Sequence, residues 1–253
     1  MKKVRLISLL LVAIISMPAM AFSTDDERID SYLELLEKTG MEKEKTKMVE
    51  RLQWSGLSDP RLYDPIEKFL LENSTKKSID IEKTTRKLMA HMLLALSYSG
   101  NEKYRTTLNQ FSKNKGPGNL SKYAKRALGN LGEYGSWNRL IATSKVDVEG
   151  KSSEVASYMK MLSVDDVLIQ RLAARAIFHE GQKDSDLIAL TAEKLKDVYL
   201  NNNLSADAQD AAAWFCKAIG QSGISEHADF LRKVADSSPH GKIKKYASKY
   251  AIK

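Results

Sequence analysis

The chain has 253 residues, of which 43% are hydrophobic, and its formal net charge is +8. The cations are mostly interspersed with acidic residues, so this charge favours an acidic partner or an anionic surface weakly and nucleic acid more weakly still. The single cysteine, Cys216, excludes an internal disulfide. Because its neighbours are apolar, we expect a buried and unreactive thiol.

The first 21 residues have the pattern of a secretory signal peptide. Three cations precede an apolar run of about ten residues, roughly half of what a membrane-spanning helix needs, and small residues at Ala19 and Ala21 follow it. The sequence predicts cleavage after Ala21 and a periplasmic or secreted protein with no stable membrane anchor. Residues 22–253 are expected to form one domain. Loss of the three cations lowers the net charge from +8 to +5.

Apolar residues recur at three- and four-residue spacing through most of the chain after the leader, whereas strand-like alternation and proline are scarce. This pattern predicts an all-α fold. Segments of helical length are separated by glycine-rich or polar breaks. In chain order, the expected breaks are Gly40, 56–60, 73–78, Gly100, 116–118, 132–135, 146–153, Gly181, 201–203, Gly223 and 237–241.

One short pattern recurs in the predicted helices: alanine, a branched aliphatic residue, three variable residues and glycine. Its copies are ALSYSG (95–100), ALGNLG (127–132), AIFHEG (176–181) and AIGQSG (218–223), with a fainter RLQWSG (51–56). In the four clear copies, the positions seven and three residues before the alanine are also apolar, which completes one helix face. These positions are Leu88, Leu120, Ile169 and Ala211, and Met92, Ala124, Ala173 and Phe215.

Each copy is interpreted as the end of a helix, where glycine supplies a left-handed cap. In ALGNLGEYGSW (127–137), we therefore expect Ala127 and Leu128 to complete a helix face, Gly132 and Gly135 to form a turn, and Trp137 to begin the next helix. A phosphate-binding glycine loop is not expected, because no strand precedes the run and no lysine with a hydroxyl residue follows its glycines.

The spacing of the five glycines leaves room for two antiparallel helices per unit. Such units cannot bury their apolar faces alone, which predicts an α-solenoid of five to six helix pairs. Three segments resemble the HEAT family of helical repeats, particularly its short bacterial type: SKYAKRALGNLGEYGSWNRLI (121–141), QRLAARAIFHEG (170–181) and SGLSDPRLYDPI (55–66). The resemblance covers about residues 41–253 and implies a curved stack of helix pairs that binds other macromolecules.

Catalytic and metal-binding motifs are not found in the sequence. The four histidines lack metal-ligand spacing, and no nucleophile elbow is present. His91, in an apolar helix, is expected to pack in the core, and His179 suits a helix end. Acidic residues at 25–27 and 165–166 are interpreted as caps at helix starts. We therefore expect a protein that is not an enzyme and has no cofactor or metal.

A column of cations is the most suggestive candidate site. Arg126, Arg175 and Lys217 each precede the repeat alanine, and Lys122 and Arg171 lie four residues earlier on the same helix face. On the concave side of a solenoid they would form a positive strip that binds a protein partner with acidic character. The alternative is that they are ordinary solvent-facing positions of amphipathic helices.

The sequence thus favours an exported scaffold or adaptor that binds a protein, and no nucleic acid. One alternative is an immunity protein that neutralises an exported toxic enzyme, such as a lipase or a peptidoglycan hydrolase. Another is an enzyme accessory subunit. Trp54, Trp137 and Trp214 occupy different positions in the repeats, so separate packing roles are expected for them.

Overall fold

The computed structural model describes residues 22–75, 81–113 and 119–251, so the expected leader at 1–21 and the expected break at 116–118 lie outside the described residues. Within these ranges the chain is helical and contains no strand. The α-helices are α1 (Asp25–Glu37), α2 (Glu42–Arg51), α3 (Pro60–Asn73), α4 (Lys83–Tyr98), α5 (Arg105–Lys113), α6 (Leu120–Ala142), α7 (Ser153–Ser163), α8 (Val167–Glu180), α9 (Ser185–Val198), α10 (Ala206–Ser222), α11 (Ala228–Ser237) and α12 (Gly241–Tyr250). Three short 3₁₀ helices are η1 (Leu52–Trp54), η3 (Glu102–Tyr104) and η4 (Ser225–His227).

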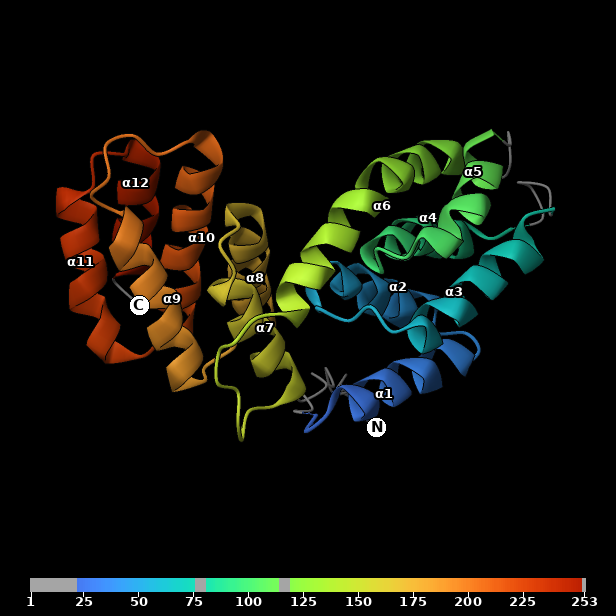
Figure 1. Ribbon diagram of the computed structural model, residues 1–253, viewed down its shortest axis with the longest axis horizontal. Helices are drawn as coiled ribbons and strands as arrows, with labels where there is room; N and C mark the ends of the chain where they lie inside the picture. Colours follow the sequence, from blue (N-terminus) through green and yellow to red (C-terminus); the bar gives the residue numbers. More distant parts are fainter. Residues whose placement is uncertain (1–21, 76–80, 114–118, 252–253) are drawn as a thin grey trace, which may run out of the picture.

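The helices pack in sequential pairs, from α1 with α2 to α11 with α12. The even-numbered helices also stack on one another in two runs. In the first run α2 packs on α4 and α4 on α6, and in the second α8 packs on α10 and α10 on α12. Figure 1 shows the corresponding two groups side by side, α1 to α6 on the right and α7 to α12 on the left. We call them the N-terminal group and the C-terminal group. Between them, α6 contacts α7 and η1 contacts α8.

The buried apolar side chains form two clusters that match these groups. One includes residues from Ile29 to Tyr134, and the other includes residues from Ile141 to Ala251. Trp137, near the end of α6, packs against both clusters. Trp54 belongs to η1 in the N-terminal group but packs against the C-terminal cluster. Tryptophan side chains therefore connect the two cores.

Local signals in the sequence account for many helix ends. The side chain of Asp166 accepts hydrogen bonds from backbone N–H groups in the first turn of α8, which confirms the expected acidic cap there. At α1 the cap is Thr24, and the acidic residues 25–27 lie in the first turn of the helix, where they suit its dipole. At the other end, α8 and α10 stop at Gly181 and Gly223, whose φ angles are 64° and 72°. Glycine adopts this left-handed conformation without the steric cost of a Cβ atom.

The apolar columns predicted from the repeat pattern are confirmed. In each clear copy, four positions form the column: the alanine, the residues seven and three positions before it, and the aliphatic residue after it. All of them are buried except Leu128, which is partly exposed. These side chains face the neighbouring even-numbered helices and fill the two cores. The 3.6-residue period in the sequence therefore identified the packed faces correctly.

The expected turn in ALGNLGEYGSW is wrong, because α6 continues through it to Ala142. Leu131, Tyr134 and Ile141 extend the buried face of the helix beyond Gly132. Gly135 has a different role: a Cβ atom on it would lie 2.8 Å from the carbonyl oxygen of Gly100. The glycine permits the backbone of α6 to approach the end of α4, and this contact is invisible in the local sequence.

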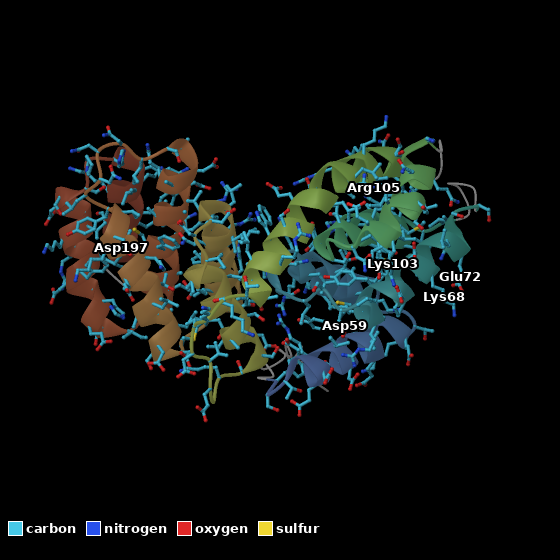
Figure 2. The ribbon with its side chains drawn as sticks, in the orientation of Figure 1. Asp59, Lys68, Glu72, Lys103, Arg105 and Asp197 are labelled. Atoms are coloured by element: carbon cyan, nitrogen blue, oxygen red, sulfur yellow. The ribbon has the colours of Figure 1, made fainter. Side chains whose placement is uncertain are left out.

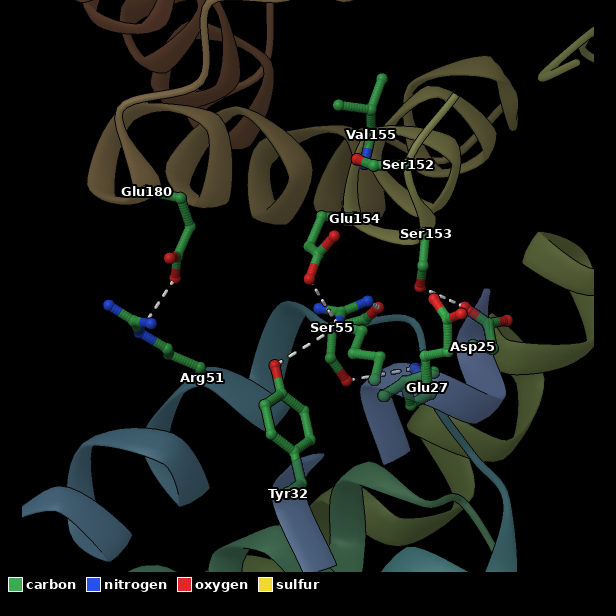
Figure 3. A network of polar contacts seen from close by, with 12 residues as sticks. Asp25, Glu27, Tyr32, Arg51, Ser55, Ser152, Ser153, Glu154, Val155 and Glu180 are labelled. Carbon is green, nitrogen blue, oxygen red and sulfur yellow. Dashed lines mark hydrogen bonds and ion pairs between the residues drawn. The ribbon is translucent and has the colours of Figure 1, made fainter. Parts of the chain in front are cut away.

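Polar contacts hold the N-terminus of the described chain against the C-terminal group (Figure 3). Arg28 of α1, which is 2% exposed, donates to the carbonyl of Ser55 with an Nη1–O distance of 3.0 Å. Its Nε lies 3.4 Å from Oε1 of Glu154 in α7. Ser153, next to Glu154, donates its hydroxyl to Asp25. At the junction between the two groups, the buried cation of Arg28 is therefore satisfied by a carbonyl of the N-terminal group and a carboxylate of the C-terminal group.

We predict opposite effects for alanine at two glycines of α6. Gly135→Ala should lower the free energy of unfolding by about 1 to 3 kcal/mol, because the new Cβ collides with backbone atoms. Gly132→Ala adds a methyl group where no atom lies within 4 Å, so it should raise that free energy by about 0.5 to 1 kcal/mol through helix propensity. Urea denaturation measures both. Destabilisation by Gly132→Ala would contradict a continuous α6.

We also predict that Arg28→Ala lowers the free energy of unfolding by roughly 3 kcal/mol, because Glu154 would be left without its buried partner. The matched control is Lys38→Ala, directly after the end of the same helix, whose ion pair with Glu34 is exposed and should contribute less than about 1 kcal/mol. Equal losses in urea denaturation would show that Arg28 does not brace the junction.

Candidate functional site

The structure distributes the five predicted binding cations over three helices. Lys122 and Arg126 are exposed on α6, Arg171 and Arg175 lie one turn apart on α8, and Lys217 lies on α10. Because α8 and α10 pack directly against each other, the last three come together. The first two belong to the N-terminal group on the other side of the junction.

Arg171 is compensated within the chain. Its Nη1 lies 2.9 Å from Oδ1 of Asp207 and 3.4 Å from Oδ2 of Asp210, both in α10. Asp210 also pairs with Lys242 of α12, with an Nζ–Oδ1 distance of 2.6 Å. This set of charges braces three neighbouring even-numbered helices. The positive charge of Arg171 is therefore balanced at its own position.

Arg175 has aromatic neighbours instead of acidic ones. Its Cζ lies 5.7 Å from the ring centroid of Trp54 and 5.5 Å from that of Trp214. Cations at such distances are attracted to the ring faces, by about 0.5 to 2 kcal/mol depending on desolvation. The Nε atom of Arg175 is buried and finds no hydrogen-bond acceptor among the described residues. The guanidinium is thus held in place by rings that leave part of its donor capacity unused.

His179, one turn beyond Arg175 on α8, lies against the same two tryptophans. Its ring stacks on Trp54 with centroids 5.9 Å apart and tilts against Trp214 at 5.6 Å. The expectation of separate packing roles is therefore wrong for these two tryptophans. Their positions in the repeats do not reveal that η1 packs against α8. That contact brings the rings of Trp54 and Trp214 together, although they are 160 residues apart in the sequence. Trp137 does pack elsewhere, edge-on to Tyr134.

Lys217 extends the same arrangement to α12. Its Nζ lies 3.4 Å from the ring centroid of Trp214 and 4.3 Å from that of Tyr246. Burial lowers the pKa of this ammonium group. The ammonium group of Lys217 is partly desolvated by the two rings, but it remains next to solvent because the side chain is only half-buried. The cation–aromatic cluster, as we call it, consists of Trp54, Arg175, His179, Trp214, Lys217 and Tyr246.

Four of the five predicted binding cations have no acidic partner among the described residues. No carboxylate lies within ion-pair distance of Lys122, Arg126, Arg175 or Lys217 in the part of the chain that the structure describes. Lys103 and Arg105, both labelled in Figure 2, are paired. Lys103 lies 2.6 Å from Asp64, and Arg105 pairs with Glu102. Other described cations, such as Lys196 and Lys233, also lack an ion pair, so the absence of a carboxylate partner does not by itself single out the column.

Charges of both signs and from both groups act on the buried hydroxyl of Tyr98 in α4. Burial raises its pKa to about 12. The charge of Arg126 opposes that increase, the charge of Glu50 adds to it, and the charge of Arg175 opposes it. Acidic and basic side chains thus lie together near the junction of the two groups. At its edge, Glu180 accepts a hydrogen bond from the indole of Trp54 and pairs with Arg51, at 3.4 and 3.2 Å.

Sequence reasoning identified Arg175 and Lys217 but missed the aromatic members of the cluster. Trp214 could have been found, because it lies three residues before Lys217 on one helix face. His179 has the same relation to Arg175 at four residues. Trp54 gave no such signal, since it joins the cluster only through the contact between η1 and α8.

The rest of the described chain offers little for chemistry. No group of three or more metal-ligating side chains is found among the described residues. Cys216 is buried as expected, and burial raises the pKa of its thiol to about 12. His91 is only partly buried and lies 3.2 Å from Glu50. An open cavity of about 650 Å³ near the start of α1 is lined by mixed charges, including Asp26, Arg61 and Lys160.

The pKa of His179 should report the charge of its neighbours. Burial, followed by the cation of Arg175, lowers this pKa below its usual value of 6.5. The folded state therefore binds fewer protons than the unfolded state there, and this site loses stability as the pH falls below 6.5. In an NMR titration of the imidazole, Arg175→Gln should raise the midpoint. An unchanged midpoint would show that Arg175 does not face His179.

Comparison of the chain with protein-family models, with curated proteins and with solved structures found no match. None of the described helices has both the length and the apolar character needed to cross a bilayer. The function must therefore be argued from the geometry of the molecule. The feature that the geometry singles out is the cation–aromatic cluster, in which Arg175 and Lys217 lie against tryptophan rings.

Proposed function

We propose that the chain is a HEAT-like α-solenoid of six helix pairs that works as an exported, protein-binding scaffold or adaptor. The pairwise packing of helices along the chain and the stacking of the even-numbered helices support this architecture. Repeated apolar columns on α4, α6, α8 and α10 support it as well. In solenoids, successive repeats build extended surfaces that bind other macromolecules.

The unpaired cations carry the proposal of an acidic protein partner. Lys122, Arg126, Arg175 and Lys217 lack carboxylate partners among the described residues, whereas Arg171 on the same column is neutralised. Charge complementarity directs partner choice and speeds association. An acidic surface that lies across α6, α8 and α10 would supply the missing anions.

The alternative of an ordinary solvated face explains Lys122 and Arg126 equally well, since both are exposed. It explains Arg175 and Lys217 less well, because ordinary surface cations are fully hydrated and these two lie against indole rings. Tryptophan, tyrosine and arginine are the residues that dominate binding energy at protein interfaces. The cluster therefore favours a binding surface that is not catalytic.

We predict that reversing two exposed charges weakens partner capture. Lys122→Glu with Arg126→Glu should reduce binding by at least about tenfold, because favourable charge pairs become repulsive. The matched control is Lys196→Glu with Lys233→Glu, which changes the same amount of exposed charge on α9 and α11. The immobilised protein is incubated with an envelope extract of the source organism, and bound proteins are quantified by mass spectrometry.

Circular dichroism should show the same helix content for the three proteins. An exported lipase or peptidoglycan hydrolase as the captured protein would identify the adaptor as an immunity protein. Equal capture by all three proteins would refute the proposed binding face.

A further inference from the structure

We propose that the cation–aromatic cluster is the anchoring point for an acidic segment of the partner, in which an aspartate or glutamate side chain binds Arg175 and Lys217 beside Trp54 and Trp214. This inference rests on the proposed function and specifies where the partner docks. It assigns the main contact to the junction of the two groups, whereas the exposed cations of α6 contribute at its edge.

The cluster presents two cations to one point. Both Arg175 and Lys217 lie against the ring of Trp214, with Cζ at 5.5 Å and Nζ at 3.4 Å from its centroid. Both side chains are half-buried, so each keeps a solvent-facing end. A carboxylate that reaches this end meets two positive charges that have no acidic partner among the described residues, and it displaces less water than at a fully hydrated lysine.

The donor set favours a carboxylate over other anions. A guanidinium presents a planar fork of N–H groups that matches a planar carboxylate, and flat rings beside it leave apolar walls for the aliphatic stem of an acidic side chain. The rings attract the charge of Arg175 but accept no conventional hydrogen bond from it, and its buried Nε has no acceptor among the described residues. An incoming carboxylate would accept from the Nη groups at the solvent-facing end of the side chain.

Docking at this point would also contact both groups of helices. Trp54 comes from η1 in the N-terminal group, whereas Arg175 and Trp214 come from α8 and α10. An acidic segment seated at the cluster therefore meets side chains of both groups at once.

The test uses two ten-residue peptides with blocked ends, one alternating glutamate with alanine and one alternating glutamine with alanine. Binding is followed by tryptophan fluorescence of the Trp137→Phe protein, in which Trp54 and Trp214 are the remaining reporters. We expect a saturable change with the glutamate peptide at low ionic strength and none with the glutamine peptide. Added salt should weaken the binding.

Arg175→Gln with Lys217→Gln should weaken binding of the glutamate peptide by at least about tenfold, because two charge-assisted contacts are lost. The control Lys196→Gln with Lys233→Gln removes the same charge elsewhere and should change binding by less than about twofold. Arg175→Lys keeps the charge and loses the fork, so it should weaken binding by an intermediate factor. This variant keeps the test valid if the double variant folds poorly.

Equal affinity of the two double variants, or equal binding of inorganic polyphosphate and the glutamate peptide, would overturn the inference. Partner capture separates it from the proposed function. If Lys122→Glu with Arg126→Glu abolishes capture but Arg175→Gln with Lys217→Gln does not, the docking point is wrong and the adaptor function stands. If neither change alters capture, both are wrong.

Discussion

The contact of Arg175 with Trp54 and Trp214 links the two helix groups and forms the centre of the candidate binding surface. The two apolar cores are separate, and α6 and α8 do not continue the close stacking of the other even-numbered helices. Trp54, which belongs to the N-terminal group, packs against the C-terminal core. There the half-buried guanidinium of Arg175 contacts the rings of both Trp54 and Trp214. Together with the buried cation of Arg28, this contact adds charged interactions to the apolar packing of Trp54 and Trp137 at the junction.

The junction also explains how cations of one sequence column have different roles. Where the next helix offers acids, as α10 does for Arg171, the cation becomes part of a structural brace. Where it offers rings, as at Arg175 and Lys217, the charge is positioned and partly desolvated but not neutralised. A positioned charge without a counterion is suited to binding, because little side-chain entropy remains to be lost when a partner arrives.

Much of the helical packing could be predicted from the sequence, because apolar period and capping are local properties. The columns through Ala95, Ala176 and Ala218 are buried as expected, and Gly181 ends its helix as expected. The turn at ALGNLG was wrongly predicted because Gly135 serves a backbone contact with Gly100, and no local pattern reveals it. Only the two cations of the cluster were predicted, for the same reason: they follow the repeat, whereas Trp54 joins them through a tertiary contact.

The most direct test of this account is a double-mutant cycle between Trp54 and Arg175, measured as free energies of unfolding in urea. Trp54→Leu, Arg175→Gln and the double variant isolate the energy of the contact from the effects of each side chain alone. We expect a favourable coupling of about 0.5 to 2 kcal/mol between the two side chains, as for a partly desolvated cation against an indole ring. Strictly additive effects would contradict it, since they would mean that Arg175 does not connect the two groups of helices.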